Sequence, residues 1–326
     1  MSDSSMMTQG KQGIGYWAPL EAGWERMKKL LFRPFDLGLW LVLGFSAWLA
    51  GLGSGPGGSG FNFGDHSHHF GDSLRDGFST LFHSTLLISI FLFVGLAVIL
   101  LIAIILWISS RSKFIYLDNV LCQKAEIIEP WGRMRRLGDS LFLWRLGFML
   151  AVFLLAILLV GIPLVAAAVA GGGDIDSLSV FSLSVMGVAI VLSVIFLVLS
   201  ATLVGLFLDA FVVPIMYRFE LKATEAWRYF LPWLKARPGA FILYAAFVLL
   251  LTMGFGIVSV LACFMTCCIA ALPYIGTVIF LPLLVTYRYF SLEWLAQFDE
   301  GFDFFSPLPG NEDAEAEILP GEIIPD

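Results

Sequence analysis

The sequence predicts an all-α polytopic membrane protein with six transmembrane helices, arranged as three tandem repeats of an interfacial amphipathic helix plus two spans. Composition is the first observation: hydrophobic residues make up 59% of the 326 residues and charged residues 14%. A soluble domain has about half apolar and about a quarter charged residues. The other two observations are a set of long apolar stretches and a short motif that occurs three times.

The apolar stretches approach or exceed the length of about 20 residues that a helix needs to cross a bilayer. The expected spans cover residues 37–53, 84–108, 146–170, 183–213, 240–272 and 276–295.

The repeated motif places a tryptophan and basic residues just ahead of an apolar stretch. Its copies begin at Trp24, Trp131 and, in a weaker form, Trp227, and apolar residues recur within them every three or four positions. This spacing indicates one apolar stripe on a helix. A basic helix with a tryptophan anchor is typical of the lipid headgroup region. The predicted interface anchors are Trp24, Trp131, Trp227, Arg133, Arg135 and Arg136.

These features divide the chain into three parts. Residues 1–15 are predicted to be a disordered leader, and residues 16–298 the six-span membrane domain, with repeats at about 16–120, 121–215 and 216–298. The acidic residues 299–326 are predicted to be a disordered tail because charge and proline dominate their composition. The tail is interpreted as a solubilising segment or as a docking peptide for a cytoplasmic protein.

The placement of basic residues predicts the orientation in the membrane. In a six-span arrangement every lysine and arginine except Arg75 falls on one side. Lysine and arginine are enriched in cytoplasmic loops. We therefore expect a multi-pass protein of the cell membrane, of the prokaryotic plasma-membrane kind, with both termini in the cytoplasm.

One exterior loop carries a candidate metal site at Asp65, His66, His68 and His69. Imidazole and carboxylate groups at close spacing suit zinc or a similar transition metal. The loop begins with a glycine-rich stretch, so a hydrated polar loop without metal is the competing interpretation.

Charged residues are also expected within the membrane. Asp209 lies near the end of a long apolar run, with Arg288, Glu293 and Arg145 as candidate partners. Ionisable groups in a membrane usually face a partner or a cavity. The site is therefore interpreted either as a structural salt link near the cytoplasmic boundary or as part of a substrate or proton path.

Small residues are expected where the spans contact one another, since they allow close approach of membrane helices. The candidate contact positions are Gly44, Gly95, Gly161, Gly187 and Gly205.

The chain resembles a known kind of membrane domain through three short segments: Glu21-Ala-Gly-Trp24, Glu129-Pro-Trp131 and Glu225-Ala-Trp227. This pattern is similar to the membrane domain attached to some bacterial glycerophosphodiester phosphodiesterases, and to related six-span prokaryotic families. The resemblance implies a stand-alone integral membrane protein. The phosphodiesterase domain itself is not present in the sequence.

No catalytic motif is found: the chain contains no G-x-S-x-G, H-E-x-x-H or P-loop sequence. We therefore expect a non-enzymatic protein that organises or senses the bilayer or scaffolds a partner. The expected partners are the lipid bilayer, including anionic lipids, and a cytoplasmic protein at the tail; no cofactor and no nucleic acid are expected. The alternative function is transport of a small solute or lipid through a site between the repeats.

Overall fold

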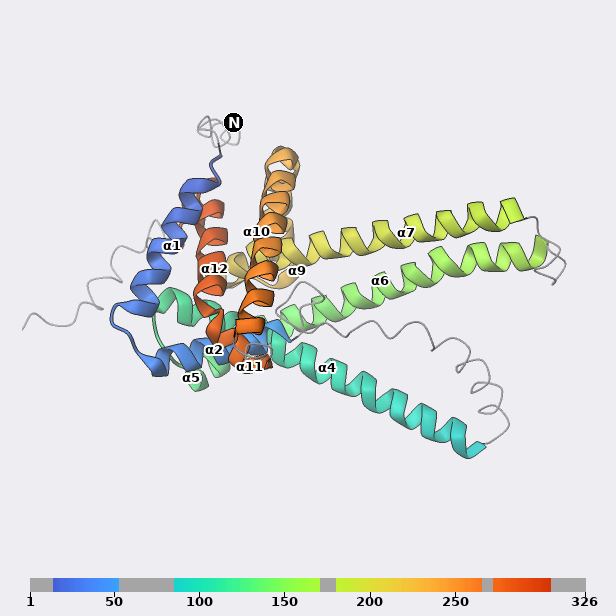
Figure 1. The fold of residues 1–326 in the computed structure, drawn as a ribbon, viewed down its shortest axis with the longest axis horizontal. Helices are drawn as coiled ribbons and strands as arrows, with labels where there is room; N and C mark the ends of the chain where they lie inside the picture. The colour runs from blue at the N-terminus through green and yellow to red at the C-terminus, as the bar shows by residue number, and fades with distance from the viewer. Residues whose placement is uncertain (1–13, 53–84, 171–179, 266–271, 306–326) are drawn as a thin grey trace, which may run out of the picture.

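The protein consists of a compact base from which four long helices extend (Figure 1). The architecture comes from a computed structural model, which describes residues 14–52, 85–170, 180–265 and 272–305. Every regular element among these residues is a helix, as the sequence predicts. In chain order the elements are α1 (Trp17–Phe32), α2 (Leu37–Gly51), α4 (Thr85–Cys122), α5 (Ile128–Arg133), α6 (Arg135–Ala170), α7 (Val180–Phe207), the π-helix η2 (Leu208–Val212), α8 (Val213–Phe219), α9 (Ala223–Ala236), α10 (Pro238–Met265), α11 (Pro273–Ile279), α12 (Leu281–Ala296) and the 3₁₀ turn η4 (Glu300–Phe302).

Among the described residues, four helices are long and apolar enough to cross a membrane. They cover Ser89–Cys122, Arg135–Pro163, Ser184–Phe219 and Pro238–Met265, and they correspond to the second to fifth expected spans. The helices at the first and last expected spans are shorter, since α2 has 15 residues and α12 has 16. At 1.5 Å per residue each measures about 22–24 Å, less than the bilayer core of about 30 Å.

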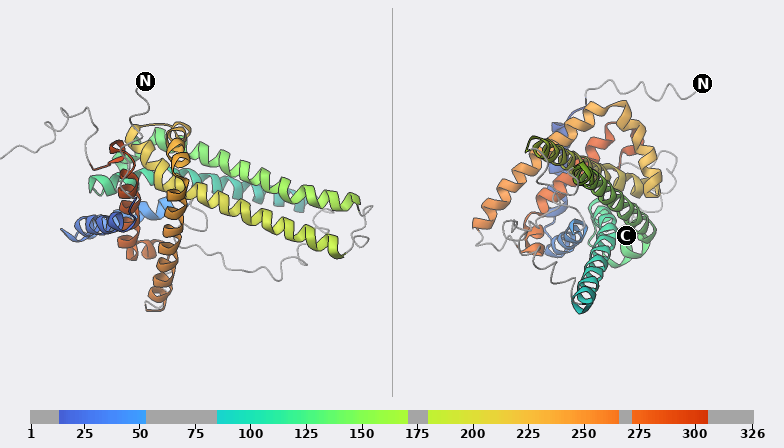
Figure 2. Two further views of the ribbon diagram at one scale, coloured as in Figure 1. Left: turned by 90° about the horizontal axis from the view of Figure 1, so that it is seen from above. Right: turned by 90° about the vertical axis from the view of Figure 1, so that its right-hand side faces the viewer.

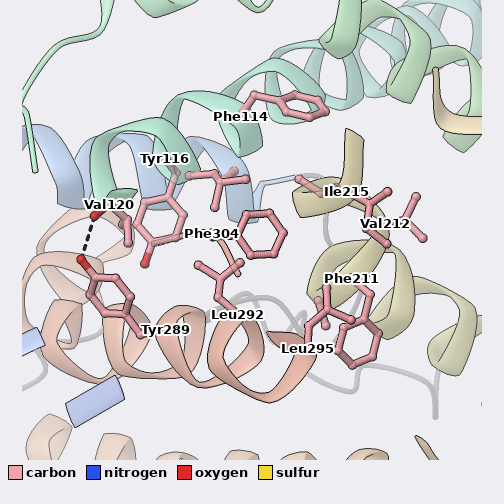
Figure 3. Packing of buried hydrophobic residues seen from close by; sticks show 14 of the residues in the cluster. Phe114, Tyr116, Val120, Phe211, Val212, Ile215, Tyr289, Leu292, Leu295 and Phe304 are labelled. Atoms are coloured by element: carbon pink, nitrogen blue, oxygen red, sulfur yellow. Dashed lines mark hydrogen bonds between the residues drawn. The ribbon is translucent and has the colours of Figure 1, made fainter. Parts of the chain in front are cut away.

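The base is held together by aromatic packing at the ends of the long helices. Phe211 of η2, Phe241 of α10 and Trp294 of α12 are fully buried, and each pair of their rings lies 5.2–5.5 Å apart. Figure 3 shows how this cluster continues between α4 and α12, where the hydroxyl of Tyr289 donates to the carbonyl of Val120 at 2.7 Å. A buried tyrosine thus packs its ring and satisfies its hydroxyl at the same time.

The packed region extends beyond the expected end of the membrane domain at residue 298. Phe302 is fully buried and Phe304 is 8% exposed, so both belong to the base although they lie in the segment predicted as tail. At the other terminus, Gly15 and Gln297 exchange two hydrogen bonds of 2.9 and 3.0 Å. The remainder of the predicted leader and of the predicted tail lies outside the described residues.

The four long helices leave the base as arms: α6 and α7 run side by side, whereas α10 points in another direction (Figure 2). We define the arms as residues 85–105 of α4, 146–170 of α6, 180–205 of α7 and 249–265 of α10. The remaining described residues form the base. None of the arm residues is charged. The most hydrophobic window of each long helix is at most 6% buried, so the arms expose apolar surface on nearly all sides.

The expected helix contacts at glycines are confirmed at only one of five positions. A Cβ at Gly44 would lie 2.6 Å from Val278 Cγ2, so α2 and α11 approach closely there. At Gly95, Gly161, Gly187 and Gly205 a Cβ would meet no atom within 4 Å. The contact prediction is wrong at these four positions because the glycines lie on arms whose hydrophobic windows pack against little protein.

The first amphipathic helix was expected at the lipid surface, yet its apolar stripe is buried against protein. Met27, Leu30 and Leu31 of α1 are at most 4% exposed, and α1 packs along α12. In α9, Ala223, Ala226 and Phe230 are likewise buried. The second expected surface helix is reduced to the six-residue α5. The stripes are real, but their apolar faces contact the base.

Gly23 sets the close approach of α1 to α12 and provides a test of this packing. A Cβ there would lie 3.0 Å from the Phe290 nitrogen and 3.1 Å from the Thr286 oxygen, both backbone atoms that cannot move aside. Overpacking typically costs about 1–3 kcal/mol, and alanine regains about 1 kcal/mol of helix propensity. We expect Gly23→Ala to lower the melting temperature in detergent. Gly147→Ala is the control, because a Cβ there meets nothing within 4 Å. Equal melting temperatures for both variants would contradict the α1–α12 packing.

Candidate functional site

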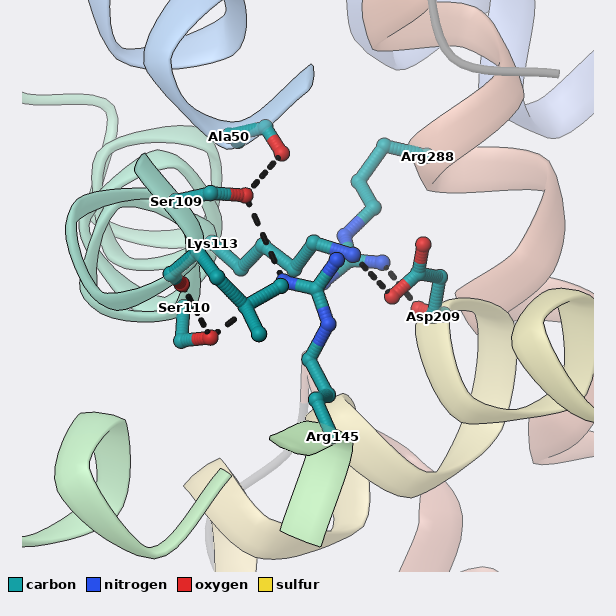
Figure 4. Close-up of polar contacts among 8 residues, drawn as sticks. Ala50, Ser109, Ser110, Lys113, Arg145, Asp209 and Arg288 are labelled. Atoms are coloured by element: carbon teal, nitrogen blue, oxygen red, sulfur yellow. Dashed lines mark hydrogen bonds and ion pairs between the residues drawn. The ribbon is translucent and has the colours of Figure 1, made fainter. Parts of the chain in front are cut away.

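A cluster of charged side chains lies where three helices of the base meet. Lys113 comes from α4, Asp209 from η2 and Arg288 from α12 (Figure 4). The ammonium group of Lys113 forms an ion pair with the Asp209 carboxylate. Arg288 Nη1 donates to the backbone carbonyl of Asp209 at 2.6 Å. Asp209 therefore connects two cations from two other helices, one through its side chain and one through its main chain.

The local sequence explains why the Asp209 carbonyl is available to Arg288. In an α-helix this carbonyl would accept from the Val213 N–H, but in the π-helical turn that N–H donates to Leu208 instead. The next donor in a π-helix would be residue 214, which is a proline and has no N–H. Buried backbone carbonyls need a donor. Arg288 supplies the donor that the π-turn and Pro214 together remove.

A fourth helix adds another cation beside this cluster. Arg145 of α6 donates from Nη1 to the hydroxyls of Ser109 and Ser110 at 3.3 and 3.2 Å. These hydroxyls donate in turn to the carbonyls of Ala50 and Leu106 at 2.8 and 2.7 Å. Figure 4 shows the guanidinium group of Arg145 directed toward Lys113 and Arg288. The network thus connects α2, α4 and α6 with η2 and α12.

The cations of the cluster are more buried than the carboxylate. Lys113 is 7% exposed and Arg288 is 8% exposed, whereas 37% of the Asp209 side-chain surface is accessible. The four side chains of Lys113, Arg145, Arg288 and Asp209 carry three positive charges and one negative charge, which gives a net charge of +2. A buried excess of positive charge is costly unless an anion compensates it.

The structure brings together only some of the predicted intramembrane charges. Asp209 and Arg288 do meet, although Arg288 binds the main chain of Asp209 and the carboxylate pairs with Lys113, which was not a predicted partner. Glu293 lies elsewhere and accepts from Arg26 Nε at 2.5 Å. The sequence signal that was missed is Pro214, five residues after Asp209, which marks a carbonyl without a backbone donor.

The predicted interface anchors divide into packed and exposed residues. Trp131 packs against Trp107, and Trp227 stacks on Trp144 with ring centres 5.4 Å apart. Trp24 remains 44% exposed. Protein contacts therefore engage two of the three tryptophans, which limits their role as lipid anchors.

The predicted arginine anchors differ from one another in the same way. Arg133 Nη2 donates to both carboxylate oxygens of Asp118 at 2.7 Å. Arg135 has a 74% exposed side chain, whose Nε lies 3.8 Å from Asp139 Oδ2, and Arg136 is exposed. Asp118 therefore holds Arg133, whereas Arg135 and Arg136 remain exposed.

The predicted metal ligands Asp65, His66, His68 and His69 lie outside the described residues. Within the described ranges, no three His, Cys, Asp or Glu side chains are grouped so that they could hold a metal ion. The charged cluster at Asp209 holds a single carboxylate among cations, which is the wrong donor set for a metal.

Comparison with family models gives one match, which spans residues 18–297. The chain belongs to DUF7544, a family of unknown function. The family match covers nearly all of α1 and continues to the end of α12, so it includes all four arms but not Phe302 and Phe304 of the base. Comparison with curated proteins and with solved structures finds no match. The resemblance to phosphodiesterase membrane domains therefore rests on the three glutamate–tryptophan segments alone.

The Asp209–Lys113 pair can be tested by a double-mutant cycle. Removing one partner of a fully buried pair costs about 3–5 kcal/mol. Asp209 is partly accessible, so we expect Asp209→Ala to cost about 2 kcal/mol, and Asp209→Asn less because its amide still forms hydrogen bonds. Adding Lys113→Met should restore part of the loss, measured by thermal unfolding in detergent.

Glu293→Ala is the control for this cycle. Its partner Arg26 has a 41% exposed side chain, and such pairs contribute about 1 kcal/mol or less. Restoration of Asp209→Ala by Arg145→Met, with no effect of Lys113→Met, would show that the pairing is assigned to the wrong cation.

Proposed function

We propose that this protein is a non-enzymatic integral membrane protein that organises or senses the bilayer, with its arms and the helices α2 and α12 in lipid and the rest of its base at the cytoplasmic surface. The observation that carries the proposal is the separation of charge along the long helices. In α4, α6 and the α7–α8 run, every charged residue lies in the base and the arms carry none. Charged side chains at the centre of a bilayer are costly. The arms are therefore suited to hydrocarbon and the base to the headgroup region.

We propose six spans, with residues 37–53 and 276–295 crossing the membrane as the first and last. The segment 53–84 is rich in glycine and polar residues, so it is unsuited to cross lipid. If the far end of α4 lies outside, the preceding apolar helix α2 has to carry the chain across. The clustering of basic residues in the base supports a cytoplasmic location for it and for both termini.

Two ion pairs support an origin from three repeats. Lys113 and Arg288 each lie five residues before an acid, Asp118 and Glu293 respectively. Each of these acids pairs with an arginine two residues after a motif tryptophan: Arg133 after Trp131, and Arg26 after Trp24. The second helix of one repeat thus pairs with the surface helix of the next, in cyclic order. Asp209 occupies the position that matches Lys113 and Arg288.

Transport is the second candidate, and the charged cluster is the specific observation in its favour. Lys113, Asp209 and Arg288 come from the second helix of each proposed repeat and meet between the repeats. A transporter is expected to hold its substrate in such a place. The exposure of the long helices favours membrane organisation instead, because among the described residues their most hydrophobic windows are at most 6% buried.

Residues 299–326 complete the proposal as a docking segment for a cytoplasmic protein. Phe302 and Phe304 are buried in the base, so the acidic residues that follow begin at a defined point on its surface.

Cysteine labelling tests the proposed topology. In a cysteine-free background, cysteines at positions 60 and 70 should react with an impermeant reagent from outside, and those at 125 and 225 only after the cells are opened. Labelling of position 225 in intact cells would exclude six spans with a cytoplasmic base.

The lipid contact of the base can be tested at Arg135 and Arg136. Each basic residue near an anionic surface contributes about 1 kcal/mol. We expect the double change to glutamine to reduce the phosphatidylglycerol that co-purifies with the protein. Arg133→Gln is the control, since Arg133 is held by Asp118 and should affect melting temperature more than lipid content. Unchanged lipid content in the double variant would mean that these arginines serve only to set orientation.

A further inference from the structure

We propose that the cluster of Lys113, Arg145, Arg288 and Asp209 binds a phosphate group, either that of a phospholipid headgroup or a free phosphate. The lipid source rests on the proposed placement of the base at the membrane surface, whereas the phosphate chemistry does not. The inference adds a ligand class and a binding site to the proposed membrane function.

The charge of the cluster calls for an anion. Among the charged groups that act most strongly on Lys113, Asp209 is an anion, and Arg145 and Arg288 are cations. Asp209 also serves as the anion for Arg145 and for Arg288. The Asp209 carboxylate is thus shared by three cations, and the formal charges of these four side chains sum to +2. A phosphate monoanion or dianion has the charge needed to balance this excess.

The cluster also offers donors beyond those that its internal bonds use. Arg288 Nε is buried and has no hydrogen-bond partner, although its Nη1 is engaged by the Asp209 carbonyl. The Lys113 ammonium has three protons, and its hydrogen bond to Asp209 uses one of them. A buried N–H without a partner is destabilising. A ligand oxygen beside Arg288 Nε would satisfy it.

The geometry favours phosphate over a planar carboxylate. The donors come from three directions, with Lys113 on α4, Arg145 on α6 and Arg288 on α12 (Figure 4). A tetrahedral oxyanion presents oxygens in several directions, and arginine forks match phosphate well. The Asp209 carboxylate lies beside the cations, and its charge opposes an incoming anion.

The site lies at the level where lipid phosphates are expected. The charge-free stretch of α4 ends at Ser110, and Lys113 follows three positions later, about 4.5 Å along the helix. In the proposed placement this distance brings Lys113 from the hydrocarbon boundary into the headgroup region.

The test is ligand-dependent thermal stability of the full chain in a maltoside detergent, which carries no phosphate. Three probes are titrated at matched ionic strength: inorganic phosphate, short-chain phosphatidylglycerol, and oleate as an anionic amphiphile without phosphate. We expect saturable stabilisation by phosphate, by phosphatidylglycerol or by both, and little by oleate. Stabilisation by inorganic phosphate identifies a free phosphate as sufficient, and stabilisation by phosphatidylglycerol alone identifies the headgroup.

Substitutions then locate the effect. Arg145→Gln should weaken phosphate or phosphatidylglycerol binding by about tenfold or more, because a charge-assisted hydrogen bond is lost. Asp209→Asn should strengthen it, because the opposing carboxylate is removed. Arg228→Gln is the matched control, since Arg228 is exposed on α9 and outside the cluster. A purely structural network would give no saturable ligand effect.

Three outcomes would overturn the proposal: no stabilisation by any phosphate probe, equal stabilisation by oleate, or equal losses in Arg145→Gln and Arg228→Gln. Poor folding would weaken ligand binding in both variants, so weaker binding by Arg145→Gln together with stronger binding by Asp209→Asn excludes that explanation. Because the titration is done in detergent, its result is independent of the topology experiment. The phosphate site and the membrane function can therefore fail separately.

Discussion

The hydrogen bond from Arg288 to the Asp209 carbonyl is the contact around which the base is organised. It exists because the π-turn redirects one N–H and Pro214 removes the next, which leaves a carbonyl that only a side chain can satisfy. The same turn places the Asp209 carboxylate beside Lys113. One irregular turn thus ties α12 and α4 to the end of α7, and the aromatic cluster of Phe211, Phe241 and Trp294 packs directly beside it.

The cost of burying charge explains why base and arms are so different. The base holds several ion pairs and tolerates buried charged residues because carboxylates, hydroxyls or carbonyls of neighbouring helices contact them. The most hydrophobic windows of the long helices pack against little protein, so a charge there would have few such partners. Two of the arms accordingly contain no charged residue from residue 85 to 105 or from 146 to 170. The charge pattern along the long helices therefore follows from where these helices pack against protein.

The sequence predicted the helical class and the four long apolar helices at the second to fifth expected spans, because apolar runs of about 20 residues or more are typical of transmembrane helices. It also identified Asp209 and Arg288 as residues that need partners. It did not predict Lys113, because a lysine near a span end resembles any other topology determinant until the fold shows what it faces. Periodicity predicted apolar stripes on α1 and α9, but it does not say whether a stripe faces lipid or protein, and Trp24 of the α1 stripe is 44% exposed. Gly23 and Met27 decide this for α1 only through their contacts with α12.

The proposed repeats make the departure from symmetry informative. Two second helices end in the same arrangement, a cation followed five residues later by an acid that pairs with the next surface helix. The remaining one has an acid where the others have cations, and a proline where they have acids; its surface helix has Tyr229 where the others have arginine. The other two repeats keep this ion pair between the acid and the arginine. The repeat of Asp209 lacks both residues of the pair, since Pro214 and Tyr229 occupy their positions. With Asp209 in place of a third cation, the three second helices bring one carboxylate together with Lys113 and Arg288. The carboxylate reduces the repulsion between the two cations, and the three side chains together keep a net positive charge. That net charge is what a phosphate ligand would balance, so the broken repeat and the proposed site have the same physical origin.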